Sequence, residues 1–379
     1  MTDNEGDNLP AGSRGRVGAL GLTVVAIASG ALAVLAWIVG GGFPEAAAGD
    51  RRAAAIGEEP AIPPPLPVPL ANNAVAATET ADGWALFSFL GIDSTRRREG
   101  ITTAAFRWTL GSTGWRRIGS VPGEPRLAAT AQAVDGLIYL FGGYTVSEDG
   151  AERSVPDVFV YHPDGDYWTP AAPMPTPVDD AMSGVWRDSL IYVVSGWHDT
   201  DNVSLVQVYD PRADEWHQAT PIPGPPVFGH AGGISGDAIV YVDGTRVDRA
   251  PRRFALETSS WMGQIDPADP TRITWRRLPD HPGLGLYRAA AVGTERFVLF
   301  GGGTDNPYNY DGTGYDGVPS EPRDGVFAWD VGTEMWRKLA PLEVPTMDHR
   351  GLVEAAGHVY AIGGMTPGRV VTGRTTIVR

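Results

Sequence analysis

The sequence predicts an all-β protein made of six similar sheets arranged in a ring, and three observations support this. An aromatic residue at the end of a β-type run is followed seven residues later by tryptophan at four places, Trp108/Trp115, Tyr161/Trp168, Tyr209/Trp216 and Trp329/Trp336. Hydrophobic strands closed by glycines precede such steps, as in residues 137–143, 190–196 and 297–302. The unit recurs about every 50 residues, which is typical of copies that bury their faces against one another.

Each unit is expected to hold four antiparallel strands: an inner strand, the glycine-closed strand, the aromatic strand and the tryptophan strand. Six glycine-closed strands can be counted, which favours a six-bladed β-propeller, an arrangement that leaves only short, protected edges. In the fourth unit, residues 254–257 are predicted to be the third strand, separated from Trp275 by an insertion that contains residues 262–271. The last unit ends with a third strand, residues 375–379, so about residues 60–70 are expected to close the ring as its outer strand, where proline is tolerated.

Composition agrees with one large repeat domain and excludes several classes of function. The 379 residues include 49 glycines and 32 prolines, as expected of many short strands joined by turns. The formal net charge of −15 argues against a nucleic-acid partner, which needs clustered lysine and arginine. The absence of cysteine excludes disulfides and thiolate metal sites.

The N-terminal part predicts a membrane anchor. Residues 17–44 carry no charge and exceed the roughly 20 residues that span a bilayer. Arg14 and Arg16 precede them, so residues 1–16 are expected to form a cytoplasmic tail, residues 17–44 a transmembrane anchor or uncleaved signal sequence, residues 45–59 a linker, and residues 60–379 the propeller. We therefore expect a single-pass protein of the inner (cytoplasmic) membrane with an extracytoplasmic propeller. Signal cleavage, giving a secreted or periplasmic protein, is the alternative.

The glycine pair, the aromatic strand and the seven-residue step to tryptophan resemble kelch repeats over about residues 60–379. Residues 125–143 resemble the bacterial N-acetylneuraminate epimerase (mutarotase) family, and Arg350 also has a plausible counterpart there. The resemblance implies a six-bladed, exported propeller that reopens and recloses a sugar ring without a cofactor. Copper-radical oxidases of the galactose oxidase type share the architecture but need a cysteine, which this chain lacks.

The same resemblance implies a catalytic glutamate in the loop after the second strand of the fourth blade. Thr245 stands there, and a hydroxyl does not act as a base near neutral pH. The candidates that remain in this loop are Asp248 as the base and Arg246 or Arg252 as the arginine.

Strand order places the links between blades on the same face as the loops between second and third strands, so together they predict the rim of a central funnel. The first three links carry Asn73, Arg126 and Asp179, whereas the last three carry His230, Arg288 and Arg350 at one equivalent position about three residues further along. Arginine binds carboxylates with two parallel hydrogen bonds, which indicates an acidic ligand. The alternative is that these arginines pair with Asp179 and backbone carbonyls and lock neighbouring blades together.

Two loops on that face are rich in polar residues. Residues 196–202 contain His198, and residues 304–316 contain Asn309 and Tyr310. Tyrosine and asparagine at such density favour an adaptable binding surface, although long turns need asparagine and aspartate as well. No metal-ligand spacing is present, so neither a metal nor a cofactor is expected.

The resulting hypothesis is a membrane-anchored recognition module for an acidic sugar, or for a protein or glycan partner. A mutarotase-like sugar epimerase is the alternative, and whether the chain is an enzyme stays open at this point.

Overall fold

The computed structural model describes residues 61–248 and 253–379. The predictions for the cytoplasmic tail, the anchor at residues 17–44 and the linker at 45–59 lie outside these residues, as does Arg252. Among the residues that are described, no helix is both long and apolar enough to cross a membrane.

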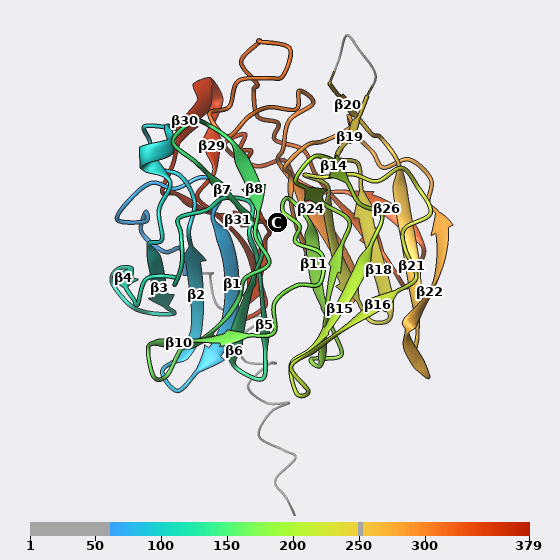
Figure 1. The fold of residues 1–379 in the computed structure, drawn as a ribbon, viewed down its shortest axis with the longest axis horizontal. Helices are drawn as coiled ribbons and strands as arrows, with labels where there is room; N and C mark the ends of the chain where they lie inside the picture. The colour runs from blue at the N-terminus through green and yellow to red at the C-terminus, as the bar shows by residue number, and fades with distance from the viewer. Residues whose placement is uncertain (1–60, 249–252) are drawn as a thin grey trace, which may run out of the picture. The chain divides into compact units, whose positions relative to one another are not determined.

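Six antiparallel sheets follow one another along the chain, which confirms the predicted number of blades (Figure 1). From the inner to the outer strand they are β1 (Ala74–Thr80), β2 (Gly83–Phe89), β3 (Ala105–Thr109) and β4 (Arg116–Arg117); β5 (Thr130–Val134), β6 (Leu137–Phe141), β9 (Val158–His162) and β10 (Tyr167–Ala171); β11 (Met182–Trp186), β12 (Leu190–Val194), β15 (Val206–Asp210) and β16 (Glu215–Ala219); β17 (Ala231–Ser235), β18 (Ala238–Val242), β21 (Ser260–Asp266) and β22 (Asp269–Arg277); β23 (Ala290–Gly293), β24 (Phe297–Gly301), β25 (Val326–Asp330) and β26 (Met335–Lys338); and β27 (Val353–Ala355), β28 (His358–Ile362) and β31 (Thr375–Val378).

Short elements decorate the loops between second and third strands. They are the hairpins β7 (Tyr144–Val146) with β8 (Glu152–Ser154), β13 (Trp197–His198) with β14 (Asp201–Asn202), β19 (Thr245–Val247) with β20 (Phe254–Leu256), and β29 (Met365–Thr366) with β30 (Val370–Val371), together with the 3-10 turns η1 (Arg98–Gly100) and η2 (Pro367–Arg369). The labelled hairpins lie at the upper end of the blades in Figure 1.

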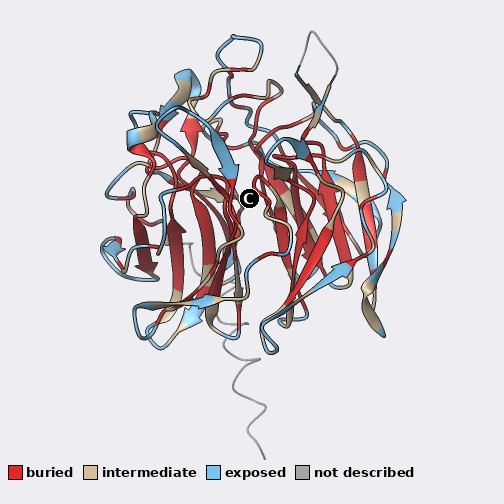
Figure 2. Ribbon diagram, viewed as in Figure 1, coloured by how far each residue is buried: buried red, intermediate tan, exposed pale blue. Residues whose placement is uncertain are grey.

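The hydrophobic core lies between the blades. One buried cluster joins Phe87 and Phe89 of the first blade to Ile138, Leu140 and Tyr161 of the second. Equivalent clusters join each following pair, and one of them joins the sixth blade back to the first. The inner strands are buried whereas the fourth strands are largely exposed (Figure 2). Because each blade offers two apolar faces, only a closed ring buries all of them.

The seven-residue step has a simple origin in strand register. Tyr161 lies directly opposite Trp168 across the β9–β10 pair, and the same pairing joins Tyr209 to Trp216. Their ring centroids are 4.9 and 5.0 Å apart, respectively. Such aromatic pairs contribute about 0.5–1.5 kcal/mol beyond the area they bury.

The residues that close the second strands all have left-handed backbones. In the second blade Gly142 and Gly143 have φ of 56° and 90°, and a Cβ on Gly143 would lie 2.5 Å from the carbonyl oxygen of Leu127. The corresponding pair in the fifth blade is Gly302 and Gly303, one residue later than the sequence suggests.

The fourth blade corrects the predicted strand assignment. Residues 254–257 do not supply its third strand, because Phe254–Leu256 forms β20 and pairs with β19 in a small hairpin above the blade. The third strand is β21, Ser260–Asp266, and β22 follows it after a short turn. The inserted residues 262–271 lie within the long hairpin of β21 and β22, where Trp275 lies opposite Gly263, so they do lengthen the step to tryptophan. Residues 254–257 belong instead to the loop between second and third strands, on the funnel face.

The prediction that residues 60–70 close the ring is correct for their position but wrong for their secondary structure. In four blades the tryptophan indole donates a hydrogen bond to a carbonyl of the preceding blade, such as Trp168 to Gly119 at 2.8 Å. In the first blade Trp115 donates to Pro64 at 2.8 Å, so residues near Pro64 stand where the last blade lacks a fourth strand. The described part of residues 60–70 is nevertheless not a strand, because Pro63, Pro64 and Pro65 have no N–H to donate.

Candidate functional site

The links between blades meet the loops that follow the glycine pairs, as expected for a funnel. Isolated β-bridges join Asp179 to Trp197, Phe228 to Thr245, and equivalent residues in the other four blades. These bridges fix the register of the links and correct the predicted alignment. His230, Arg288 and Arg350 lie two, one and three residues after their bridge residues, so they are not equivalent to one another.

The equivalent residues form a ring around the axis. They follow the bridge residues directly and all have φ between 49° and 67°: Asn72, Ala128, Asp180, Gly229, Arg288 and Asp348. The N–H of Asp180 donates to the carbonyl of Ala128 at 3.1 Å, that of Gly229 to Asp180 at 2.8 Å, and that of Arg288 to Gly229 at 2.7 Å. This chain of hydrogen bonds ties the third, fourth and fifth blades each to the one before it.

A buried network of charges fills the centre of the ring. The Arg288 guanidinium donates two hydrogen bonds to Asp180, at 3.1 and 2.6 Å, and one to Asp348 at 3.2 Å. Arg350 also donates to Asp180, and Asn72 donates to Asp348 at 2.9 Å. Although burial opposes ionisation, Arg288 and Arg350 hold the pKa of Asp180 below its ordinary value.

In this network, two of the three arginines predicted to bind a ligand already form ion pairs within the protein. Arg288 and Arg350 pair with Asp180 and Asp348, not with Asp179 as the interlocking hypothesis assumed. Asp179 instead accepts a hydrogen bond from Ser154 at 2.6 Å. Burial and the neighbouring charge of Asp180 raise the pKa of Asp179 well above its ordinary value. Two adjacent aspartates thus have opposite protonation preferences.

A cavity of about 600 Å³, here called the funnel cavity, lies above this network. Loops of the first five blades and the links supply its wall, and the lining includes four predicted residues, Asp179, Arg288, Asn309 and Tyr310. Aromatic side chains contribute further surface from Tyr144, Trp197, Phe228, Phe254 and Tyr315. Aromatic faces beside carboxylates, amides and guanidinium groups suit a polar ligand with some apolar surface.

The cations at the mouth of the funnel cavity are Arg96, Arg97, Arg98 and Arg253. Arg96 donates to the carbonyl of Asp311 at 2.7 Å, and Arg98 pairs with Glu99 at 3.4 Å. Arg253 stacks over the ring of Phe254 at 5.0 Å. Within the described residues, neither Arg97 nor Arg253 makes an ion pair, so both guanidinium groups are available to an anion.

Glu152 is the acidic residue of the mouth that stands apart. It retains exposed surface, yet the surrounding concave wall removes enough water to raise its pKa. Arg288 and Arg253 oppose this shift, and Asp180 adds to it. Glu152 and Asp179 are close enough to interact electrostatically, and both line the funnel cavity.

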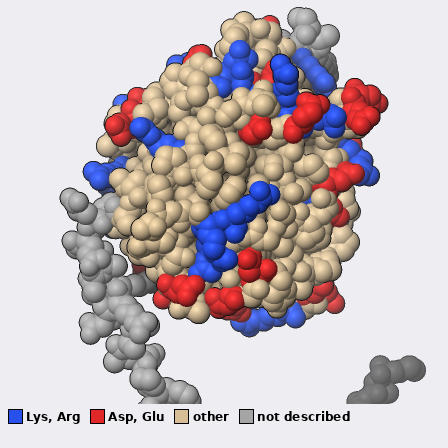
Figure 3. Space-filling model, turned by 90° about the vertical axis from the view of Figure 1, so that its left-hand side faces the viewer, with Lys and Arg blue, Asp and Glu red and all other residues tan. Residues whose placement is uncertain are grey.

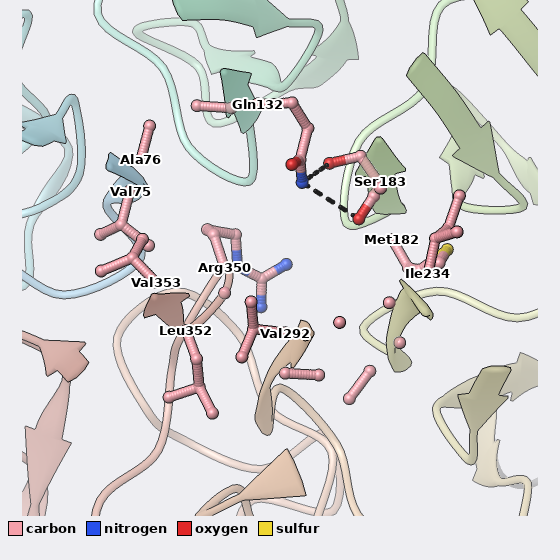
Figure 4. Close-up of a pocket in the computed structure, with 18 of the residues that line it drawn as sticks. Val75, Ala76, Gln132, Met182, Ser183, Ile234, Val292, Arg350, Leu352 and Val353 are labelled. Carbon is pink, nitrogen blue, oxygen red and sulfur yellow. Dashed lines mark hydrogen bonds between the residues drawn. The ribbon is translucent and has the colours of Figure 1, made fainter. Parts of the chain in front are cut away.

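A second, smaller cavity of about 210 Å³ follows the axis between the inner strands and is here called the channel. Arg350 and His230 line it, and Gln132 donates to Ser183 at 2.9 Å on its wall (Figure 4). The charge network lies between the two cavities, because Asp180 and Arg288 line the funnel cavity whereas Arg350 lines the channel. Burial lowers the pKa of His230 to about 4, so this imidazole is neutral at physiological pH.

Three predicted binding residues line neither cavity. Asn73 donates to Ser88 at 2.9 Å, Arg126 is fully buried and pairs with Asp157 at 3.2 Å, and His198 lies 2.7 Å from the carbonyl of Pro177. These contacts hold loops and blades together.

The loop of the fourth blade does not present its predicted catalytic groups to the funnel cavity. Arg246 pairs with Glu257 at 3.3 Å and with Asp248 at 3.8 Å, and none of the three lines the cavity. Thr245 is fully buried in β19. No group of three or more metal-ligating histidine or carboxylate side chains occurs among residues 61–248 and 253–379.

Sequence reasoning missed the cations of the mouth and the carboxyl of Glu152. The run Arg96–Arg98 follows the glycine-closed strand of the first blade, so the funnel rule itself pointed to it. Glu152 lies in a hairpin that the sequence did not reveal.

The chain matches known proteins over part of its length. The Kelch motif family matches residues 125–175 and 187–223. N-acetylneuraminate epimerase of Yersinia enterocolitica is 37% identical over 59 residues, which is 15% of this chain and 15% of that protein. N-acetylneuraminate epimerase of Haemophilus influenzae is 32% identical over 88 residues, or 22% of this chain and 23% of that protein. Each match thus spans less than a quarter of the curated relative.

A solved structure shares the whole architecture. The structure of YjhT superposes with a TM-score of 0.67 at 18% identity, covering 84% of this chain and 97% of that chain. At this identity the likeness shows the fold alone.

Proposed function

We propose that this chain, a kelch-repeat propeller that resembles the N-acetylneuraminate epimerase family, recognises an acidic carbohydrate in the funnel cavity. One observation carries the proposal: a cavity of about 600 Å³ combines aromatic faces, carboxylates that accept hydrogen bonds from hydroxyls, and the guanidinium groups of Arg97 and Arg253, which make no ion pair with any described residue. These arginines take the role that the sequence assigned to Arg126, Arg288 and Arg350, whose charges are already balanced. A protein or glycan partner would reach the same cavity through a terminal acidic sugar.

Saturation-transfer NMR on the full chain tests the proposal. N-acetylneuraminic acid should receive saturation from the protein, whereas N-acetylmannosamine, which lacks the carboxylate, should not. Arg97→Gln should weaken the signal, because charge-assisted hydrogen bonds are about twice as strong as neutral ones. Arg117→Gln is the matched control, since Arg117 is an exposed residue on the outer strand of the same blade. Equal signals from the acidic and neutral sugars would rule out recognition of the acid.

Mutarotation is the second candidate function, and the pair of Asp179 and Glu152 favours it. Opening a hemiacetal ring needs an acid that protonates the ring oxygen and a base that accepts the proton of the anomeric hydroxyl. Asp179 holds its proton more strongly and suits the acid, whereas Glu152 suits the base. Reclosure on the other face of the carbonyl returns both protons, so no cofactor is consumed.

Anomer exchange followed by NMR separates catalysis from binding. A mutarotase accelerates exchange of N-acetylneuraminic acid, and Asp179→Asn stops it while binding persists, since asparagine has no proton of comparable acidity. Binding without accelerated exchange leaves the recognition role and removes the catalytic one.

We also propose that residues 17–44 anchor the chain in the inner membrane with the propeller outside the cytoplasm. The uncharged stretch preceded by Arg14 and Arg16 supports this. Fractionation of cells that make the full chain should recover it with the membranes, whereas recovery in the soluble periplasmic fraction would favour signal cleavage.

A further inference from the structure

Arg97 and Arg253, the two guanidinium groups of the funnel cavity without an ion pair among the described residues, lie on blades that face each other across the axis. Arg97 precedes η1 in the loop between β2 and β3 of the first blade, and Arg253 precedes β20 in the fourth. Inner strands of successive blades pack side by side around the ring, β1 on β5, β5 on β11 and β11 on β17, so two blades separate the first from the fourth on either side. The two cations therefore mark opposite edges of one cavity.

The wall between the two arginines carries polar and aromatic side chains that suit sugar rings. Glu152 and Asp199 lie on the second and third blades, and Asn309 and Tyr310 on the fifth. Carboxylates and amides are good partners for hydroxyl groups. Trp197 packs against Phe254 with centroids 5.6 Å apart, which gives a rigid aromatic wall beside Arg253.

The size of the cavity allows a ligand with more than one sugar unit. Its volume of about 600 Å³ lies within the range of about 300–1,000 Å³ that is typical of pockets for drug-sized ligands. A monosaccharide acid carries one carboxylate and so neutralises one arginine, leaving the other cation at the opposite edge without a partner.

We propose that the preferred ligand is an anionic oligosaccharide of at least two sugar units with two acidic groups, one bound by Arg97 and the other by Arg253. The inference rests on the proposed function and narrows it from acidic sugars in general to dianionic chains. Within the described residues the other arginines of the cavity have partners: Arg288 in the charge network, Arg96 on a carbonyl and Arg98 on Glu99. Only a ligand that spans the cavity satisfies both remaining charges at once.

The charges that face the two arginines set the strength of this preference. Glu152 acts electrostatically on Arg253, and Glu99 lies two residues from Arg97. These carboxylates repel every acidic group of a ligand, so the preference for two acidic groups comes from the second group's own contact with the second guanidinium. A hydrogen bond to a charged group is worth enough for about a tenfold gain in affinity, and the link between the groups makes the second contact intramolecular.

Isothermal titration calorimetry on the full chain with N-acetylneuraminic acid and its α2,8-linked dimer tests the inference. The wild type should bind the dimer at least about tenfold more tightly than the monomer. Arg97→Gln and Arg253→Gln should each reduce dimer affinity to that of the monomer, while each changes monomer affinity only about twofold because the other arginine remains. The double variant should lose both ligands, and Arg117→Gln should behave as the wild type.

The outcomes separate the two proposals. Equal affinity of the wild type for monomer and dimer overturns the spanning ligand but leaves acidic-sugar recognition intact. A dimer preference that survives either single substitution also overturns it, because the second group is then bound elsewhere. Failure of both sugars to bind the wild type overturns the proposed function and this inference with it.

Discussion

Asp179 and Asp180 are neighbours in the chain with opposite energetic roles. Asp180 is ionised between two guanidinium groups. Asp179 lines the funnel cavity together with Glu152 and accepts a hydrogen bond from Ser154. The difference follows from φ of 49° at Asp180, which turns its side chain to the axis, while Asp179 pairs with Trp197. Sequence alone identified the polar link but chose Asp179 as the arginine partner, because nothing in the order of residues shows which of two aspartates takes the left-handed position.

Asp180→Asn should destabilise the propeller by about 3–5 kcal/mol, since it leaves two buried guanidinium groups short of their partner. The folded pKa of Asp180 is depressed, so its contribution to stability is present above the unfolded pKa and is lost as pH falls through the folded value. Chemical denaturation across pH 2–7 measures this. An Asp180→Asn variant with the wild-type pH profile would contradict the assignment.

Asp179→Asn should raise the melting temperature at pH 7. The folded pKa of Asp179 is raised, so its favourable contribution is complete below the unfolded pKa, near 3.9, and is lost as pH rises through the folded value. Asparagine keeps the hydrogen bond to Ser154 without a charge to bury. Calorimetry at pH 7 and pH 3 checks this, with a gain at neutral pH that disappears in acid; a lower melting temperature at both would show that the carboxyl is needed structurally.

At the scale of elements, the seven-residue step from aromatic residue to tryptophan reflects the register between the third and fourth strands of a blade. It identified the β9–β10, β15–β16 and β25–β26 pairs correctly because the aromatic residues lie directly opposite tryptophan. It failed in the fourth blade, where Trp275 lies opposite Gly263 and the hairpin β21–β22 is longer. A run such as residues 254–257 is as compatible with a loop hairpin as with a blade strand, so local pattern alone did not decide between them.

The two faces of β10 provide a matched test of this register. Trp168 packs on Tyr161 and donates to Gly119, whereas its neighbour Tyr167 is 51% exposed. Trp168 is only partly buried, so Trp168→Ala should cost about 3 kcal/mol, the lower end of the range for truncating large aromatics, and Tyr167→Ala less than about 0.5 kcal/mol. Urea denaturation of both variants measures the difference, and similar losses would contradict the assignment of faces.

At the scale of the whole molecule, the ring depends on a segment far away in sequence. Leu66 is buried with residues of the first and last blades, and its N–H donates to the carbonyl of Gly373 at 2.7 Å. The missing strand of the last blade was enough to predict where this segment lies. The irregular backbone of this segment was not predicted. Its prolines fill the place of the missing strand by packing, and not through a ladder of backbone hydrogen bonds.

Leu66→Ala should weaken ring closure and lower the stability of the whole propeller by about 2–5 kcal/mol. Ile62→Ala is the control, since Ile62 in the same segment is 62% exposed. Thermal unfolding should stay a single transition at a lower temperature in Leu66→Ala and stay unchanged in Ile62→Ala. An effect confined to Ile62→Ala would place the closing contacts elsewhere.

The molecular surface agrees with selective binding rather than broad attraction. Acidic and basic side chains are interspersed on the face shown in Figure 3, and the net charge is −15. An acidic protein attracts few anions without specific partners, so the cations of the funnel cavity that have no ion pair within residues 61–248 and 253–379 are a local exception. The sequence located this cavity through the topology of links and loops. It did not reveal which arginines stay free, since that depends on ion pairs between distant blades.

Calorimetric titration of N-acetylneuraminic acid into the wild type and into the Arg97→Gln, Arg253→Gln double variant tests the central claim most directly. The claim is that the funnel cavity binds an acidic carbohydrate through these two arginines. The predicted result is measurable heat of binding to the wild type that disappears in the double variant, whose melting temperature is unchanged. Binding of equal strength to both proteins, or to neither, would contradict it.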